Sequence, residues 1–412
     1  MSEEKNVPRL RFPGFTEPWE QRKLSKFGEA TGGTSIESEF SEEGIYKVIS
    51  IGSYSEDNIY RDQGIRAVRS DKTINRILNK GDITMILNDK TASGNIIGRV
   101  LLIEETGVYV YNQRTERIEV DSENYNSQFI YTMLNAPAIR GKIIKQSQGN
   151  TQIYVNWTNV SQIDYLVPQI EEQIKIGMYF KSIDHLITLH QRKLEHVKDL
   201  KKSMLQKMFP KNGQSYPEVR FPGFTDAWEQ RKWCDTVDIS TEMVDPTSGE
   251  YDDMPHIAPG NIESFTGRIL DNVKSVKEEQ LISGKFRFRP GDVVYGKINP
   301  QLGKYFYASV DGLTSADAYV FNGKNGVTQK FLFSLLQTED FFKYSVSVSK
   351  RSGMPKINRD ELNAYGFLAP KEEEQEQIGS FLLEIDNLIT LHQRELDHLQ
   401  LLKKGMLQQM FV

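Results

Sequence analysis

Basic and amide side chains are sorted into short runs along a chain that is acidic overall. The 412 residues hold 51 Lys and Arg against 56 Asp and Glu, a formal net charge of −5. Residues 61–80 nevertheless carry Lys or Arg at six positions against two Asp, and residues 285–289 read KFRFR. Lys and Arg neutralise phosphates, while Arg, Asn and Gln make bidentate contacts to guanine or adenine. One such run alone indicates only a solvated surface, but recurrence in both halves of the chain favours contact with a nucleic acid.

The candidate contact residues are the basic and amide side chains of these runs and of the loops near them. They are Arg69, Lys72, Arg76, Lys90, Arg114, Gln146, Gln148 and Asn150 in the first half, and Lys285, Arg287, Lys297, Asn299, Gln301, Lys304, Lys350 and Arg351 in the second.

The sequence lacks the common signatures of catalysis. It contains no GxxxxGK[ST] phosphate loop, no GxGxxG, and no HExxH or CxxC metal spacing. Cys234 is the single cysteine and has no evident base partner, so a structural thiol is favoured over a nucleophile. We therefore expect no catalytic residues, no metal and no cofactor on this chain. One cysteine, no apolar run long enough to span a membrane and no secretory signal predict a cytoplasmic protein.

The chain contains two internal sequence repeats. Residues 11–23 (RFPGFTEPWEQRK) match residues 220–232 (RFPGFTDAWEQRK) at 11 of 13 positions, and residues 165–209 match residues 367–411 at 26 of 45. The middles between them, residues 24–164 and 233–366, differ greatly. We call these middles the first head and the second head. The pattern predicts one fold that carries two different surfaces.

The sequences of both long repeats predict long helices of the coiled-coil type. Pro168 lies just before residues 171–209, Glu171 and Glu172 place acidic charge in the expected first turn, and no proline follows until Pro210. A heptad pattern runs over five heptads in each copy, and each helix is roughly 55 Å long. Lys201 and Lys403 are exceptions at core positions. The expected spacer core is Ile183, Ile187, His190, Leu194 and Val197 in the first copy, with Ile385, Ile389, His392, Leu396 and Leu399 in the second.

Charge favours pairing of the two helices with each other. Residues 165–212 hold nine Lys or Arg and five Asp or Glu, whereas residues 367–412 hold four and eight. A pseudo-twofold arrangement of similar halves predicts antiparallel helices, and pairing with a second molecule is the alternative. His190 and His392 form either a metal-binding or pH-sensing pair or a polar pair that fixes register. No accompanying cysteine or second histidine cluster occurs, which favours register.

The heads read as mixed α/β. Strands are expected at residues 45–52, 82–87, 96–104 and 116–120 in the first head, and at 292–298, 305–310 and 318–322 in the second. A helix is expected over 126–140 and another near 328–343. The fold class is therefore α+β, with two similar mixed α/β domains joined by two long antiparallel coiled-coil helices around a pseudo-twofold internal repeat. The predicted segments are residues 1–164, 165–212, 213–366 and 367–412.

The chain resembles a DNA specificity subunit of a type I restriction–modification system. The resemblance covers essentially the whole chain. Its carriers are the RFPGF…WEQRK segments, the PxxEEQxxIG sequences at 168–177 and 370–379, and LITLHQR at 186–192 and 388–394. It implies two target-recognition domains, each reading half of a split double-stranded DNA sequence, and two spacer helices between them.

The resemblance also implies partners. It predicts docking of two methyltransferase subunits and of restriction–translocase subunits, with S-adenosylmethionine, ATP and Mg²⁺ bound by those partners and none by this chain. If residues 171–209 and 373–411 pair as antiparallel helices of this length, we expect a fixed, non-specific gap of about five to eight base pairs between the half-sites. A coiled-coil adaptor that holds two protein ligands and binds no DNA is the alternative, and an enzyme active alone is disfavoured by the missing motifs.

Overall fold

The computed structural model describes residues 7–90, 93–149, 152–211, 213–350 and 353–411. The chain divides into two compact units. The first unit contains residues 1–189 and 396–412, and the second contains residues 190–395. Each unit therefore holds one head together with part of both long helices. Among the described residues, no helix combines the length and the apolar character that a membrane crossing requires.

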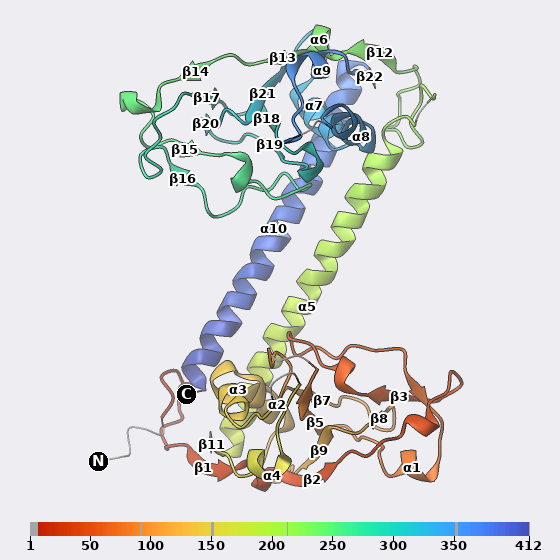
Figure 1. Cartoon of the computed structure of the whole chain (residues 1–412), viewed down its shortest axis with the longest axis vertical. Helices are drawn as coiled ribbons and strands as arrows, with labels where there is room; N and C mark the ends of the chain where they lie inside the picture. Colours follow the sequence, from red (N-terminus) through yellow and green to blue (C-terminus); the bar gives the residue numbers. More distant parts are fainter. Residues whose placement is uncertain (1–6, 91–92, 150–151, 212, 351–352, 412) are drawn as a thin grey trace. The chain divides into compact units, whose positions relative to one another are not determined.

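The first unit is built on a four-stranded antiparallel sheet in the order β2-β9-β5-β7. Its strands are β2 (Gly28–Gly32), β5 (Ile83–Ile86), β7 (Val100–Leu102) and β9 (Thr115–Val120). Strand β5 is buried along its whole length, which explains its nearly continuous run of apolar residues. Helices α2 (Ser127–Asn135) and α3 (Pro137–Ile144) pack beside this sheet and share its core (Figure 1).

The second unit repeats this plan with different residues. Its four-stranded antiparallel sheet has the order β13-β21-β18-β19. The strands are β13 (Val237–Ile239), β18 (Val293–Gly296), β19 (Tyr305–Tyr307) and β21 (Ala318–Gly323). Helices α7 (Gln329–Leu336) and α8 (Glu339–Val348) pack beside it (Figure 1). The four-stranded sheet and its helix pair are therefore a shared frame, as the repeated sequence predicted.

The heads differ in a second sheet. The first head has three strands in the order β4-β3-β8, and the second has five in the order β14-β17-β20-β15-β16. In the first head these are β3 (Tyr46–Ile49), β4 (Arg66–Ala67) and β8 (Tyr109–Tyr111). In the second they are β14 (Met243–Val244), β15 (Pro255–His256), β16 (Lys274–Ser275), β17 (Lys285–Phe288) and β20 (Gly312–Thr314). The divergence in sequence is thus a divergence in structure outside the shared frame.

The short repeats pair with the start of the long repeats. In the first unit β1 (Glu20–Lys23) is antiparallel to β11 (Asp164–Val167). In the second unit β12 (Glu229–Lys232) is antiparallel to β22 (Gly366–Ala369). The same EQRK sequence thus occupies the same position in both units.

Ion pairs join the two repeated motifs in each unit. Arg11 of the RFPGF sequence donates from Nε and an Nη to the two oxygens of Glu172, both at 2.8 Å. Arg220 makes the same bidentate contact to Glu374 at 2.7 Å. Both carboxylates are 1% exposed. Removing either arginine would leave a buried charge without its partner, so the two motifs have a physical reason to occur together.

The rest of the EEQxxIG sequence holds the long helix against the head. In the first unit, Gln173 accepts a hydrogen bond from the Asn126 amide at 3.0 Å and donates to the Pro168 carbonyl at 2.9 Å. A Cβ on Gly177 would lie 3.0 Å from the Phe129 amide nitrogen at the start of α2. Only glycine lets the helices approach this closely, and Gly379 has the same role beside Phe331.

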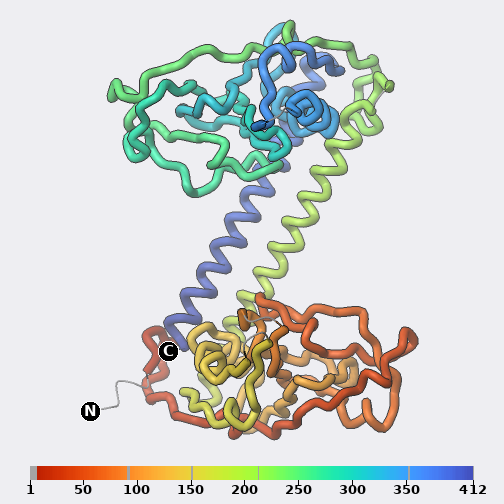
Figure 2. The backbone as a smooth tube through the Cα atoms, in the orientation of Figure 1, coloured from red at the N-terminus to blue at the C-terminus, as the bar shows by residue number. Residues whose placement is uncertain are grey.

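The long helices are α5 (Ile170–Lys207) and α10 (Glu372–Met410). In the first unit, the start of α5 lies antiparallel to the end of α10. Lys403 Nζ is 2.5 Å from Asp184, and the Phe180 and Phe411 ring centroids are 6.2 Å apart. In this unit the C-terminal end of the chain lies beside the N-terminal segment (Figure 2).

In the second unit, the end of α5 lies antiparallel to the start of α10. Lys201 forms an ion pair with Asp386, and the rings of His190 and His392 have centroids 5.7 Å apart. Phe209, which follows α5, stacks on Phe331 at 5.5 Å. The final Met-Phe of each long repeat is thus a core element: Phe411 belongs to the core of the first unit and Phe209 to that of the second.

Most predicted spacer core positions are buried. They are Ile183, Ile187, Leu194, Ile385, Ile389 and Leu396. His190, Val197, His392 and Leu399 are half-buried. Lys201, the expected exception at a core position, is 6% exposed because it pairs with Asp386.

The predictions of one helix over 126–140 and one near 328–343 were wrong in the same way. Helix α2 ends at Asn135 and α3 begins at Pro137, because Ala136 before the proline adopts extended backbone. Helices α7 and α8 are separated by Thr338, whose hydroxyl accepts a hydrogen bond from the Phe341 amide at 3.3 Å and caps a new helix. Each head therefore carries a helix pair.

The described residues also form short α-helices, which are α1 (Asp71–Ile74), α4 (Trp157–Val160), α6 (Trp233–Thr236) and α9 (Arg359–Asn363). Short 3-10 helices lie at Leu24–Lys26, Glu37–Glu39, Ile51–Ser53, Pro246–Ser248, Pro259–Asn261 and Pro300–Leu302. Two short strands, β6 (Asn88–Asp89) and β10 (Ile153–Tyr154), pair in the first head.

Candidate nucleic-acid interface

Two loops of the first head are held side by side. Strand β6 follows the central strand β5, and it pairs with β10, which precedes α4. Gln148 exchanges two backbone hydrogen bonds with Tyr154, at 2.9 and 3.0 Å. Lys90 comes directly after β6. Lys90 and Gln148 therefore project from neighbouring segments of one loop cluster, and both are exposed.

Arg114 joins the same cluster through the backbone. Its carbonyl accepts a hydrogen bond from the Leu87 amide at 2.9 Å, and the Val155 amide donates to the Leu87 carbonyl at 2.9 Å. Arg114 adopts a positive φ of 67°, which is uncommon for a residue with a side chain. Such backbone strain occurs preferentially at functional sites. Gln146, just after α3, is exposed as well.

The second head brings the corresponding loops together. The Asn299 amide donates to the Pro355 carbonyl at 2.8 Å, and the Ile357 amide donates to the Lys297 carbonyl at 3.1 Å. Asn299 also has a positive φ, 52°, and its side chain accepts a hydrogen bond from Gln301 at 3.2 Å. The loop after the central strand β18 is thus fastened to the segment before α9, as the loop after β5 is fastened to the segment before α4.

Two cationic side chains of this loop cluster in the second head lie close to the ring of Tyr319. Lys297 Nζ lies 5.1 Å from the centroid of the Tyr319 ring, and the Arg359 guanidinium lies 6.0 Å from it. The pKa of Lys297 is lowered, first because the amine is partly buried and then because Lys356 and Arg359 repel its charge. A bound anion would relieve that repulsion, so the cluster is suited to hold a phosphate.

The arrangement suits recognition of a nucleic acid. Lysine and arginine can neutralise phosphates, while Gln148, Asn299 and Gln301 can read base edges. Cys234 is exposed, and its hydrogen bond to Asp235 raises the pKa of the thiol, which disfavours the reactive thiolate.

Comparison with known proteins decides the family. The model of the type I restriction modification DNA specificity domain matches residues 16–199 and again residues 226–401. The two matches together cover most of the chain, once for each half. The chain belongs to the type I restriction–modification DNA specificity family. A coiled-coil adaptor unrelated to DNA is not favoured.

Curated relatives carry the name specificity subunit. This family member is 26% identical to the EcoDI specificity subunit of Escherichia coli over 298 residues, which span 66% of this chain and 65% of that one. It is 22% identical to the MjaVIII specificity subunit of Methanocaldococcus jannaschii over 80% of this chain and 77% of that one. The match thus spans a little under two thirds of the EcoDI subunit.

A solved structure shares the fold. The S subunit of a type I restriction–modification system from M. genitalium superposes with a TM-score of 0.68 at 12% identity, over 98% of this chain and 99% of that one. At this identity the likeness establishes the architecture alone.

The other predicted residues of the first head lie elsewhere. Lys72 donates to Ser38 at 2.8 Å and lies 3.5 Å from Glu39, and Arg69 is exposed before α1. Arg76 donates to the Gly32 carbonyl at 2.9 Å and to the Tyr111 hydroxyl at 3.0 Å. Arg76 is therefore engaged in holding the two sheets of the first head together, and these three residues lie outside the loop cluster.

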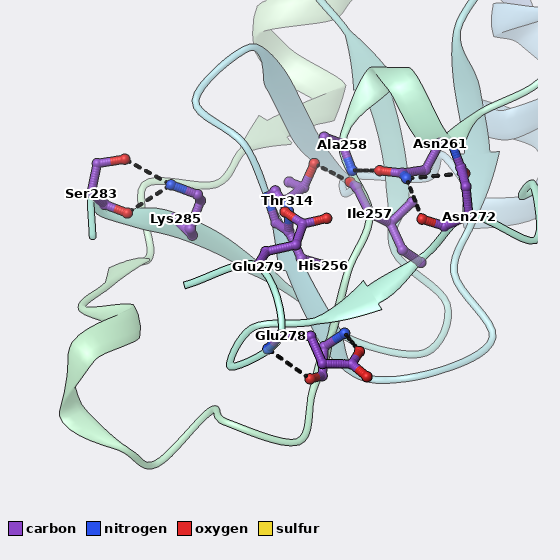
Figure 3. Close-up of polar contacts among 11 residues, drawn as sticks. His256, Ile257, Ala258, Asn261, Asn272, Glu278, Glu279, Ser283, Lys285 and Thr314 are labelled. Carbon is purple, nitrogen blue, oxygen red and sulfur yellow. Dashed lines mark hydrogen bonds and ion pairs between the residues drawn. The ribbon is translucent and has the colours of Figure 1, made fainter. Parts of the chain in front are cut away.

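Three predicted residues of the second head are engaged within the protein. Arg287 makes a bidentate ion pair with Asp311 at 3.1 and 2.7 Å, and Lys304 donates to the Ile262 carbonyl. Lys285 is 6% exposed and donates to the carbonyl and hydroxyl of Ser283, at 2.8 and 2.7 Å (Figure 3). Burial lowers the pKa of its ammonium. Its placement indicates a structural cation.

Other polar contacts lie in the second sheet of the second head and in the loops that follow its strands. His256 Nδ1 lies 2.6 Å from Glu279, and the Thr314 hydroxyl donates to the Ile257 carbonyl at 2.7 Å (Figure 3). Asn261 accepts from the Ala258 amide at 2.9 Å. These buried contacts fix loops where the sheet is irregular. Sequence reasoning found none of them: the His256–Glu279 and Thr314–Ile257 contacts join residues far apart in the chain, and the Asn261 contact is a local cap of a short turn.

Two predicted residues, Asn150 and Arg351, lie outside the described residues. Lys350, the described residue next to Arg351, is exposed. Sequence reasoning missed Lys356 and Arg359. Neither belongs to a basic run, and only the pairing of Ile298 with Lys356 brings them to Lys297. Their position just before and within the capped start of α9 was the available signal.

Proposed function

We propose that this chain is the DNA-reading, non-catalytic subunit of a type I restriction–modification complex and recognises a bipartite double-stranded target. The observation that carries the proposal is the duplicated frame with two different loop clusters. Each head holds the loop after its central strand against the segment before a short helix, and each places lysine and amide side chains there. The same frame with different side chains is what two half-sites of different sequence require.

The shared elements suit equivalent docking of identical partners. We infer that two methyltransferase subunits bind the repeated surfaces and that restriction–translocase subunits join them. S-adenosylmethionine, ATP and Mg²⁺ would be bound by those subunits. The acidic net charge of this chain implies that the partners supply much of the phosphate-binding surface. A complex of this kind would act in the cytoplasm.

The long helices suit a spacer role. Helix α5 has 38 residues and α10 has 39, and their contacts in each unit are antiparallel. We infer that they form one two-stranded coiled coil and that their length fixes the gap between the half-sites.

Exchange of one head tests the proposal. Residues 24–164 are replaced by the matching segment of a relative, and the chain is expressed with its partner subunits in a host whose methylated sites are then sequenced. We expect one half of the bipartite sequence to change while the other half and the gap stay the same. A change in both halves, or in neither, contradicts the modular assignment. The reciprocal exchange of residues 233–366 is the matched control and must change the other half.

A further inference from the structure

Three side chains with metal-ligand chemistry converge between α5 and α10 in the second unit. They are His190, His392 and Glu395. One ligand atom of each lies within 4.8 Å of the others. Glu395 Oε2 is 3.0 Å from His190 Nδ1 and 3.3 Å from His392 Nδ1. Two helices therefore contribute: His190 comes from α5, and the other two lie one turn apart on the same face of α10.

The spacing of these atoms fits a tetrahedral metal centre. Zinc binds imidazole nitrogen at about 2.0–2.1 Å and carboxylate oxygen at about 2.0–2.2 Å. Two ligands of a tetrahedron at those bond lengths are about 3.3 Å apart, by trigonometry from the same values. The Nδ1–Oε2 separations of 3.0 and 3.3 Å already match the edges of such a tetrahedron.

His190 gives independent support. Its Nδ1 atom is buried and lacks a hydrogen-bond partner, although Glu395 Oε2 lies within 3.0 Å. The two atoms are thus close without the alignment that a hydrogen bond needs. A buried polar atom without a partner is unfavourable, and coordination of a shared cation would satisfy it.

We propose that His190 Nδ1, His392 Nδ1 and a Glu395 carboxylate oxygen bind a divalent transition-metal ion, with Zn²⁺ as the first candidate. Imidazole and carboxylate ligands suit Zn²⁺, Co²⁺ and Ni²⁺. Binding requires each imidazole to carry its proton on Nε2. The side chains of His190 and His392 are 18% and 17% exposed and that of Glu395 is 42% exposed, which leaves a fourth position for water. The ion would clamp α5 to α10 in one register.

The sequence predicts no metal here, because His190 lies in a different long repeat from His392 and Glu395. His190 and His392 are equivalent positions of the repeat, but the position equivalent to Glu395 is Lys193. The internal repeat therefore supplies two histidines and a single carboxylate. Only the pairing of the helices brings the three together. A metal ion bound there would also fix the register of the helices, so one site would perform both roles considered for the two histidines.

Cobalt binding to the full-length chain tests the proposal. Titration of the metal-free protein with Co²⁺ is followed by visible absorption, because four-coordinate Co²⁺ absorbs far more strongly than the hydrated ion. We expect one ion per chain, displaced by stoichiometric Zn²⁺. H190N and H392N should each weaken binding by more than the roughly 10–100-fold that loss of an outer partner produces. E395Q, a conservative change, should also weaken it and alter the Co²⁺ spectrum.

H398N is the matched control, because His398 is an exposed histidine on the same helix. It should bind Co²⁺ as the unmodified chain does. Far-UV circular dichroism identifies the variants that keep the fold. Absence of stoichiometric binding to the unmodified chain overturns the proposal, and so does binding that survives in both H190N and H392N.

Discussion

Lys201 and Asp386 form an ion pair between α5 and α10 in which the two side chains are only 8% and 9% exposed. Burial raises the pKa of the Asp386 carboxyl, and the Lys201 charge opposes that rise. The repeat-related pair, Lys403 and Asp184, is 21% and 33% exposed. The same lysine–aspartate pairing therefore occurs in both units. The pair is buried in the second unit and more exposed to solvent in the first.

The first prediction is that K201M strongly destabilises the second unit. The substitution leaves Asp386 buried without its partner, and loss of one member of a buried pair costs about 3–5 kcal/mol. Urea denaturation of the full-length chain measures the loss. The double variant K201M/D386L should recover most of it, because apolar side chains of similar size can replace a buried pair at little cost.

K403M is the matched control. Its pair is more exposed, so its removal should cost roughly 1 kcal/mol or less. Equal losses from K201M and K403M would contradict the assignment of Lys201 to a dry interface.

The second prediction concerns Glu116, a buried carboxyl on β9. Burial raises the pKa of Glu116 to about 7, and the nearby Arg76 charge partly counteracts the rise. A carboxyl whose folded pKa lies above its unfolded value of 4.5 contributes stability that is complete below pH 4.5. That contribution is lost as the pH rises through about 7.

We therefore expect E116Q to be more stable than the unmodified chain at pH 8, by on the order of 3 kcal/mol at about 1.4 kcal/mol per pKa unit. The difference should shrink steadily towards pH 5. Urea midpoints of both proteins across this range measure it. E119Q is the control, because Glu119 is exposed on the same strand. A constant difference at all pH values would show that the glutamine acts through packing.

The third prediction separates base-reading residues from structural ones in the second head. Q301A should lower affinity for the cognate half-site by roughly 1–3 kcal/mol and relax the methylated sequence there, because an exposed amide in the loop cluster is lost. K297A should weaken binding to all sequences and reduce its salt dependence. Binding of the assembled complex to cognate and altered duplexes measures both effects.

K285A is the comparison variant. The Lys285 ammonium donates its hydrogen bonds to Ser283 within the protein. Its removal should therefore lower the free energy of unfolding without relaxing the DNA sequence specificity. Relaxed specificity in K285A with a normal urea midpoint would place Lys285 at the DNA and contradict the structural assignment.

Sequence could predict what local pattern determines. The heptads identified both long helices and even the anomalous Lys201, and enrichment in Ile, Val and Tyr identified the central strands β5 and β18. Partners far along the chain were out of reach. Nothing near Lys201 points to Asp386, and nothing in KFRFR distinguishes a buried Lys285 from a lysine that faces DNA. The residues brought together as a candidate site, such as Lys297, Lys356 and Arg359, depend on strand pairing that sequence patterns leave open.

The last prediction concerns the spacer. Four residues are inserted into each long helix between its ion-pairing residues, which are Asp184 and Lys201 in α5 and Asp386 and Lys403 in α10. Four residues make about one helical turn and add about 6 Å, so the facing seam and both ion pairs are preserved. Since base pairs rise by about 3.4 Å, the gap between half-sites should grow by about two base pairs while both half-sites stay unchanged. Sequencing of methylated sites in a strain that carries the variant and its partners measures the gap. Insertion into α5 alone is the comparison: it shifts one helix against the other and should reduce activity. An active double-insertion variant with an unchanged gap would show that the spacing is set outside these helices.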